Sequence, residues 1–461
     1  MIPDLSQKKI ILEGKRASYF YPTYSVAKQF TYKKGQFLHF ADLINTTHDH
    51  FASWNFMFDD EKIFDKYLLC ILEKKNWSKE LEDYILKIKN DMLHMLKQDK
   101  AIKEKAKYYY NQYEQLMISA GFLRGVDRAL RLHLPQCLPH KDDLAVIAVS
   151  DRLTFSAREE QSLLKKASQL KKQKRKATKD DVKEIQNTFC WSVLGYYDEQ
   201  PITTQEYVNK INLLIEQNPE LLLTQREQHL KDSLAQREKI VIQLDKKAKD
   251  MADVAAHSTF IKDLFKSSAN EVQYHAELLF LEIAKQTKNS VGFIKDLLPD
   301  EVGDLLSGKS VDKNMVEQRN KNGVVFALGG NIYVLYGKEA VAFEEKYMPK
   351  IKNEEKIFSG RIACKGYAKG KAKIVLGVKD FHKLQKGDIL IVSNTSPDFM
   401  PILSKAAAIV AEEGGITAHV SVVSRELGIP CVVGIHHIIN YLKDNDLIEV
   451  DANKGIVRKI A

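Results

Sequence analysis

The chain has 461 residues, 44% of them hydrophobic and 28% charged, and its formal net charge at pH 7 is +9. These proportions describe an ordinary soluble globular protein of about three domains. No apolar run approaches the ~18 residues that span a membrane, and the N-terminal residues lack the apolar core of a signal peptide. We therefore expect a cytoplasmic protein with no membrane partner.

The five cysteines lie far apart and form no CxxC pair. This spacing provides no zinc site and predicts reduced thiols, so we assign no metal-binding residues. Cys431 lies in an apolar stretch and is expected to pack in a core. The others are Cys70, Cys137, Cys190 and Cys364.

Up to about residue 320, apolar residues recur at three- and four-residue spacing, which predicts a mainly α-helical region. The predicted helices span 64–72, 81–96, 101–120, 205–216, 224–250 and 272–288. Residues 165–179 hold eight basic side chains but no aromatic residue that could stack on a base. This run favours a solvated helix end or loop, and nucleic acid is not an expected partner.

Three groups of side chains in the helical region have the chemistry to bind a substrate. A His-Asp-His cluster could orient a substrate, a group of tyrosines could line a pocket and three arginines could meet a phosphate. Their spacing favours surface or capping positions, core positions and a solvent face, respectively. The groups are His48, Asp49 and His50; Tyr108, Tyr109, Tyr110 and Tyr113; and Arg124, Arg128 and Arg131.

Residues 323–337 predict a β-hairpin, because two apolar runs flank Gly329, Gly330 and Asn331. A phosphate-binding loop is disfavoured, since no GxxxxGK[ST] or GxGxxG motif follows. The charged stretch 347–359 contains Pro349 and predicts a linker.

The C-terminal residues predict a compact α/β domain of about a hundred residues. Short apolar runs at 389–393, 408–410, 431–434 and 447–451 indicate strands. A helix is predicted over 419–427 and ends before Gly428 and Pro430. Its predicted apolar face holds Val420, Val423 and Leu427, and its other face holds Ser421, Ser424, Arg425 and Glu426.

His419 stands where the turn at Gly414 and Gly415 leads into this helix. Glycines allow backbone to approach a ligand closely, and a helix N-terminus attracts anions. An imidazole is largely uncharged and nucleophilic at neutral pH, because its unperturbed pKa is ~6.5. His419 is therefore a candidate phosphoryl carrier, and Thr417 a candidate partner of a phosphate oxygen or of the ring. A lone histidine at a helix start can also be a surface or capping residue.

Five blocks in this region resemble the mobile phosphohistidine domain of phosphoenolpyruvate-utilising enzymes. That family includes pyruvate-phosphate dikinase, phosphoenolpyruvate synthase and rifampin phosphotransferase. The resemblance implies that His419 is transiently phosphorylated and that Thr417 matches the threonine two residues before it. The family usually has Ser or Cys where this chain has Ala418, which puts the transfer rate in question. The blocks are 366–375, 386–403, 406–415, 417–430 and 451–457.

A looser resemblance at 293–321 implies a helical acceptor-binding region before the mobile domain. Neither the family's ATP-grasp domain nor its phosphoenolpyruvate barrel is recognisable in the sequence. We therefore expect a separate ATP-grasp protein to charge His419, a small-molecule acceptor, and Mg²⁺ that arrives with the donor. Arg425 and Glu426 are expected to fix the helix against its neighbours.

The predicted fold is thus multidomain: a mainly α-helical region over 1–322, a hairpin and linker over 323–359, and a swivelling α/β phosphohistidine domain over 360–461. The predicted function is a phosphotransferase component. The alternative is a non-catalytic binding or regulatory protein in which the phosphohistidine acts as a switch.

Overall fold

The computed structural model describes residues 9–17, 42–48, 51–58, 63–140, 143–194, 200–328, 331–347, 356–393, 395, 399–403, 405–412, 419–435 and 438–460. For the first three ranges it describes the backbone alone. The chain divides into two compact units. The first is built mainly from residues up to Ala340, and the second holds Val341–Ala461 with the segments Ile10–Ala17 and Phe51–Phe56.

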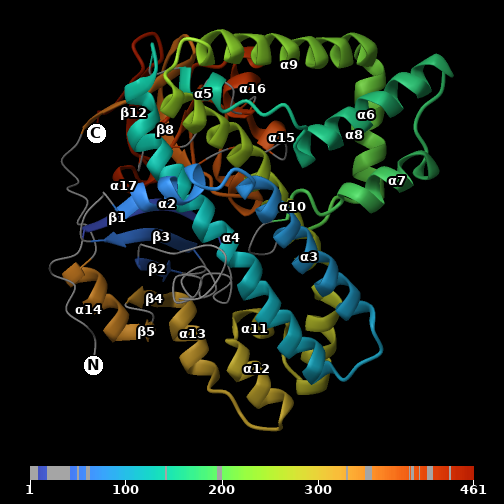
Figure 1. Ribbon diagram of the computed structural model, residues 1–461, viewed down its shortest axis with the longest axis vertical. Coiled ribbons are helices and arrows are strands. Elements are labelled where there is room, and N and C mark those ends of the chain that lie inside the picture. The colour runs from blue at the N-terminus through green and yellow to red at the C-terminus, as the bar shows by residue number, and fades with distance from the viewer. Residues whose placement is uncertain are drawn as a thin grey trace. The chain divides into compact units, whose positions relative to one another are not determined.

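Two long helices, α4 and α10, form the centre of the first unit (Figure 1). They run antiparallel, because Asp127 of α4 contacts Lys262 of α10 and Tyr113 contacts Gln273. The helix α3 packs against both. The helices are α2 (Ile63–Leu72), α3 (Trp77–Lys97), α4 (Ile102–Cys137), α5 (Asp143–Ile147), α6 (Phe155–Lys172), α7 (Lys179–Phe189), α8 (Thr204–Glu216), α9 (Pro219–Val241), α10 (Lys246–Thr287), α11 (Val291–Asp296), α12 (Pro299–Leu306), α13 (Lys313–Lys321) and α14 (Gly337–Tyr347).

The predicted helical character of this region is confirmed, but one predicted helix is wrong. Residues 224–250 were expected to be continuous, whereas α9 ends at Val241 and α10 begins at Lys246. Asp245 caps α10, because its carboxylate accepts from the backbone N–H of Ala248 at 2.8 Å. The apolar spacing continues across this break, with Ile240 and Leu244 both buried, and periodicity alone conceals the cap.

Strands β1 (Lys9–Ala17), β2 (Asp42–His48) and β3 (Phe51–Phe58) lie in a part of the sequence where the helical pattern predicted none. The predicted hairpin is confirmed as β4 (Asn322–Leu328) and β5 (Asn331–Tyr336), which pair antiparallel. β2 pairs with the other edge of β4, with His48 opposite Asn322. Val324, Val325 and Phe326 are fully buried, which is why β4 reads as a continuous apolar run.

The second unit contains an eight-stranded sheet in the order β6-β13-β12-β8-β9-β10-β11-β7. Strands β8 to β11 are parallel neighbours, and the flanking strands are antiparallel. The strands are β6 (Ile357–Ser359), β7 (Arg361–Cys364), β8 (Tyr367–Ile374), β9 (Ile389–Val392), β10 (Ala408–Ala411), β11 (Cys431–Val433), β12 (Leu447–Asp451) and β13 (Ile456–Lys459). A 3₁₀ helix η2 (Val378–Lys383) and helices α15 (Met400–Leu403), α16 (His419–Leu427) and α17 (Ile438–Tyr441) connect them.

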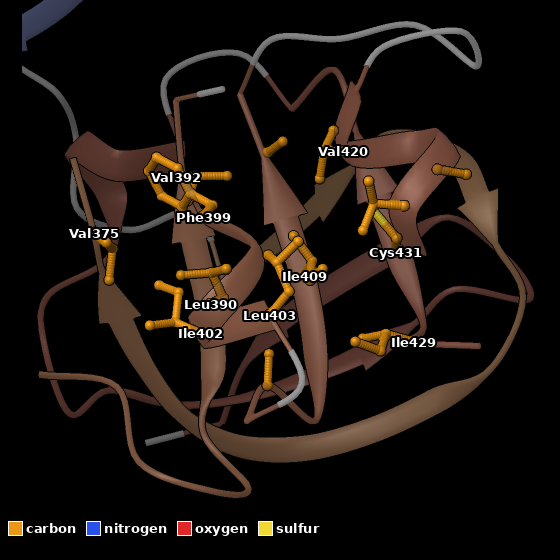
Figure 2. Packing of buried hydrophobic residues seen from close by; sticks show 14 of the residues in the cluster. Val375, Leu390, Val392, Phe399, Ile402, Leu403, Ile409, Val420, Ile429 and Cys431 are labelled. Atoms are coloured by element: carbon orange, nitrogen blue, oxygen red, sulfur yellow. The ribbon is translucent and has the colours of Figure 1, made fainter. Parts of the chain in front are cut away.

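Both faces of the central strands are buried, as is usual for parallel sheets. On β9, Leu390 and Val392 enter one cluster, whereas Ile389 and Ile391 enter another. The first cluster includes Val420 and Val423 of α16 and is shown in Figure 2. The second includes Ile438 and Ile439, at the start of α17. The predicted α/β character of this domain is thereby confirmed.

The sheet closes on itself at Gly360. β6 and β7 are the outermost strands in the order, yet this single glycine separates them in the chain. Its backbone N–H donates to the carbonyl oxygen of Gly455, between β12 and β13, at 2.8 Å. A Cβ atom on Gly360 would lie 2.7 Å from Cγ1 of Val432 in β11, so the two edges meet at a seam that only glycine fits.

Candidate functional site

The helix α16 begins at His419, as the sequence predicts, and follows the parallel strand β10. The structure therefore places the His419 backbone in the first turn of a nine-residue helix. The side chains of His419, Arg425 and Glu426 lie outside what the structure describes, and so do residues Gly414, Gly415 and Thr417 in full, together with Ala418.

The start of α16 lies after a strand of the sheet, in a position that favours anion binding. β9 and β10 are adjacent and parallel, so their carboxyl ends lie at the same edge. Ligands of α/β folds, open or closed, usually bind outside the carboxyl ends of the parallel strands. The first turn of α16 adds the positive end of the helix dipole, which attracts anions. This geometry suits a phosphoryl group near His419.

Val420 and Val423 anchor α16 to the sheet, since both side chains lie in the cluster over β9, β10 and β11. In Figure 2, Val420 lies at the same end of this cluster as Val392, the last residue of β9. The first turn of the helix is therefore fixed at the end of the sheet where the candidate site lies.

Two predicted features of this helix are wrong. Ser421 and Ser424 were placed on the outer face but are fully buried, and Leu427 was placed on the inner face but is 42% exposed. The Ser424 hydroxyl is satisfied within the helix, because it donates to the carbonyl oxygen of Ser421 at 3.1 Å. Leu427 is the last residue of the helix, before Gly428 with a φ of 65°.

Glu412 is a buried residue that the sequence analysis did not single out. It follows β10 directly, and its carboxylate accepts from the backbone N–H of Ile439 in α17 at 3.2 Å. This bond ties the end of β10 to α17. In the sequence, the one feature that distinguishes Glu412 is its place between an apolar run and the pair Gly414–Gly415.

In the helical unit, three of the four tyrosines are core, as predicted, whereas Tyr108 is only half-buried. Tyr109, Tyr110 and Tyr113 are buried, and the Tyr109 ring lies 5.4 Å from that of Phe280 in an edge-to-face arrangement. Burial raises the pKa of Tyr109 and of Tyr110 above the ordinary value for tyrosine. These phenols therefore stay protonated and contribute packing.

The arginine group is only partly a solvent face. Arg131 is exposed and pairs with Asp127, but Arg124 and Arg128 are half-buried, so the predicted exposure is wrong for them. α4 is enclosed on several sides by other helices, which a single-helix pattern cannot show. Burial opposes ionisation of Asp127, but the charges of Lys262 and Arg131 outweigh it and lower its pKa.

The other candidate groups have separate outcomes. His48 is the last residue of β2, and Asp49 and His50 lie outside the described residues. The basic run covers the end of α6 and the turn before α7, where Arg175 forms two hydrogen bonds to Asp181 at 2.7 and 2.8 Å.

No cluster of His, Cys, Asp and Glu that could hold a metal occurs among the residues described. Over the same residues, no helix has the length and apolarity to cross a membrane.

Comparison with known proteins gives a family match that lies in the second unit. Residues 384–455 match the family model described as PEP-utilising enzyme, mobile domain. A probable phosphoenolpyruvate synthase from Methanothermobacter thermautotrophicus is 37% identical over 131 residues, which cover 28% of this chain and 19% of that protein. A probable phosphoenolpyruvate synthase from Archaeoglobus fulgidus is 34% identical over 215 residues, covering 43% of this chain and 28% of that protein.

The phosphoenolpyruvate synthase of Aeropyrum pernix is 42% identical over 120 residues, covering 26% of this chain and 14% of that protein. The chain thus spans less than a third of the length of each of these relatives. A solution NMR structure of a UPF0107 protein aligns with 23% of this chain at 19% identity, with a TM-score of 0.19, which is too low to show a common fold. Residues 384–455 therefore carry the sequence pattern of the mobile domain of PEP-utilising enzymes.

Proposed function

We propose that this chain is a phosphotransferase component that carries a phosphoryl group on His419 between a donor and an acceptor. The observation that carries the proposal is the start of α16 at His419, beyond the carboxyl end of β10, within the region that matches the mobile domain. The relatives named phosphoenolpyruvate synthase support phosphoryl transfer as the chemistry.

In this proposal an imidazole nitrogen of His419 attacks the phosphorus of the donor. A nitrogen–phosphorus bond forms, and the donor's oxygen–phosphorus bond breaks. An acceptor oxygen then attacks the phosphohistidine and releases the imidazole. Phosphoryl transfer requires mainly positioning and charge stabilisation. The backbone N–H groups at Gly414 and Gly415 and the Thr417 hydroxyl are the proposed phosphate contacts, and Arg425 and Glu426 are proposed to hold α16.

The proposed organisation assigns acceptor binding or docking to residues 1–322, a hairpin and linker to 323–359, and the mobile domain to 360–461. A separate ATP-grasp protein is the proposed donor, and a small molecule the proposed acceptor. Mg²⁺ is proposed to enter with the donor's phosphates, since the described residues include no cluster of metal ligands.

Intact-protein mass spectrometry at alkaline pH, which preserves phosphohistidine, tests the proposal. The full chain is incubated with phosphoenolpyruvate, with ATP and Mg²⁺, and with ATP, Mg²⁺ and each ATP-grasp protein encoded beside it. We expect a mass gain of one phosphoryl group with one of these donors. His419→Ala should abolish it, whereas His382→Ala, a matched change in the same unit, should retain it.

Ala418→Ser is a further informative variant, because it restores the hydroxyl that the family usually carries next to the histidine. We expect it to load at least as fast as the wild type. The absence of a phosphorylated form with every donor would refute the carrier function and favour the regulatory alternative. A label that survives His419→Ala would refute the assignment of the site.

A further inference from the structure

Two of the five cysteines lie directly opposite each other in the sheet of the second unit. Cys364 is the last residue of β7, Cys431 is the first residue of β11, and the antiparallel register pairs them. The register shifts between Cys431 and Val432, so the two cysteines lie at the irregular end of a short pair of strands. Their separation in the sequence conceals this proximity.

The two thiols also share one face of the sheet. Cys431 belongs to the hydrophobic cluster beneath α16, where Figure 2 shows it, and Cys364 packs against the same cluster. Directly opposed residues of antiparallel strands have Cα atoms about 4.5 or 5.5 Å apart, and a disulfide accepts about 4.4 to 6.8 Å. Both cysteines are reduced in this structure. The backbone therefore already holds them within the range of a disulfide.

Their unequal exposure assigns an order of reaction. Cys364 is partly exposed and can meet a small oxidant, whereas Cys431 is fully buried and can meet only its neighbour. The Cys364 thiolate attacks a low-molecular-weight disulfide such as oxidised glutathione, forming a mixed disulfide and releasing one glutathione thiolate. The Cys431 thiolate then attacks the Cys364 sulfur and releases the second. The two protein thiols lose two protons and two electrons, and the oxidant becomes two thiols.

We propose that Cys364 and Cys431 form a reversible dithiol–disulfide site that stiffens the support of α16. α16 packs against both β7 and β11, and β7 is an edge strand held on one side by β11 alone in the sheet order. A covalent link across this pair restrains the edge strand and the helix resting on it. The site is thus a redox modification beneath the helix that begins at His419.

The first test is disulfide mapping of the full chain equilibrated with oxidised or reduced glutathione. Free thiols are alkylated, and the protein is digested without reduction. We expect a cross-linked pair of peptides containing Cys364 and Cys431 after oxidation, lost on reduction and absent from Cys364→Ser. Cys137→Ser, which removes an exposed thiol of the other unit, should leave the cross-link unchanged. Glutathione attached to Cys364 with Cys431 still free, or no oxidised form, would overturn the proposal.

The second test is amide hydrogen exchange of the reduced and oxidised forms. We expect the amides of β7 and α16 to exchange about tenfold more slowly in the oxidised form, with no change in α3 of the other unit. A cross-link that leaves exchange in α16 unchanged would overturn its effect on the helix. Neither readout requires phosphoryl transfer, so failure of the carrier function would leave both results interpretable.

Discussion

Replacing Gly455 by alanine should open the seam of the second unit. Gly455 has a φ of 68°, and an added Cβ would lie 2.5 Å from the carbonyl oxygen of Gly360. Because that neighbour is backbone, no side-chain rotation can relieve the clash. Gly428 is the matched control, since its φ is 65° and an added Cβ would meet nothing within 4 Å.

The two alanine variants share the cost of a left-handed backbone, about 1–2 kcal/mol for an L-residue. Gly455→Ala adds the cost of overpacking, about 1–3 kcal/mol. Amide hydrogen exchange in β6 and β13 measures this difference, because the exchange rate of an amide depends on the free energy needed to open the structure around it, locally or globally. We expect exchange in Gly455→Ala about 5- to 150-fold faster than in Gly428→Ala, at 1.4 kcal/mol for each factor of ten. Equal acceleration in both variants would refute the argument that Gly360 and Gly455 close the sheet.

Three further predictions concern stability. Arg319→Met should destabilise the helical unit by about 3–5 kcal/mol in urea unfolding, because it removes the buried guanidinium that donates to both oxygens of Glu301 at 2.8 Å and leaves that carboxylate, which is 17% exposed, without its charge partner. Lys309→Met, at the exposed pair of Lys309 and Asp304, should change stability by less than about 0.5 kcal/mol, and equal effects would contradict this view. The hydrogen bonds from Arg152 lower the pKa of Glu82. The stability that this ionised carboxylate contributes is therefore complete above about pH 4.3 and is lost as pH falls through its pKa in the folded protein. The loss of stability caused by Glu82→Gln in chemical denaturation should shrink toward low pH, and a loss that does not depend on pH would contradict the linkage. Oxidation of Cys364 and Cys431 should stabilise the second unit by about 4 kcal/mol on the chain-entropy model, measured by denaturation with and without reductant, and a less stable oxidised form would indicate a strained bond.

Local sequence was sufficient for the elements around His419. The runs in β9, β10 and β11 are short and apolar, and the helix between β10 and β11 has apolar residues at helical spacing. The end of α16 agrees with the prediction, because Gly428 takes a positive φ directly after Leu427 and Pro430 follows two residues later.

Features that depend on distant parts of the chain could not be predicted in this way. β2 pairs with β4, far along the sequence, so nothing near residues 42–48 reveals its partner. The burial of Ser421 and Ser424 depends on what packs around α16, and the pairing of Cys364 with Cys431 depends on the strand register. A periodic pattern reports which face is apolar, but it does not report what that face meets.

The seam at Gly360 also constrains the order in which the second unit can assemble. β6 pairs with β13, so the first strand of Val341–Ala461 needs the last one to form its ladder. Contacts between segments so far apart in the sequence form slowly, because the entropy cost of closing a long loop comes before the contacts can stabilise the chain. While the chain is being synthesised, β6 therefore leaves the ribosome well before its partner and presents an unpaired strand edge, the kind of surface that chaperones shield. The closed sheet of the finished domain thus implies a vulnerable interval during translation, which ends only once β13 has emerged.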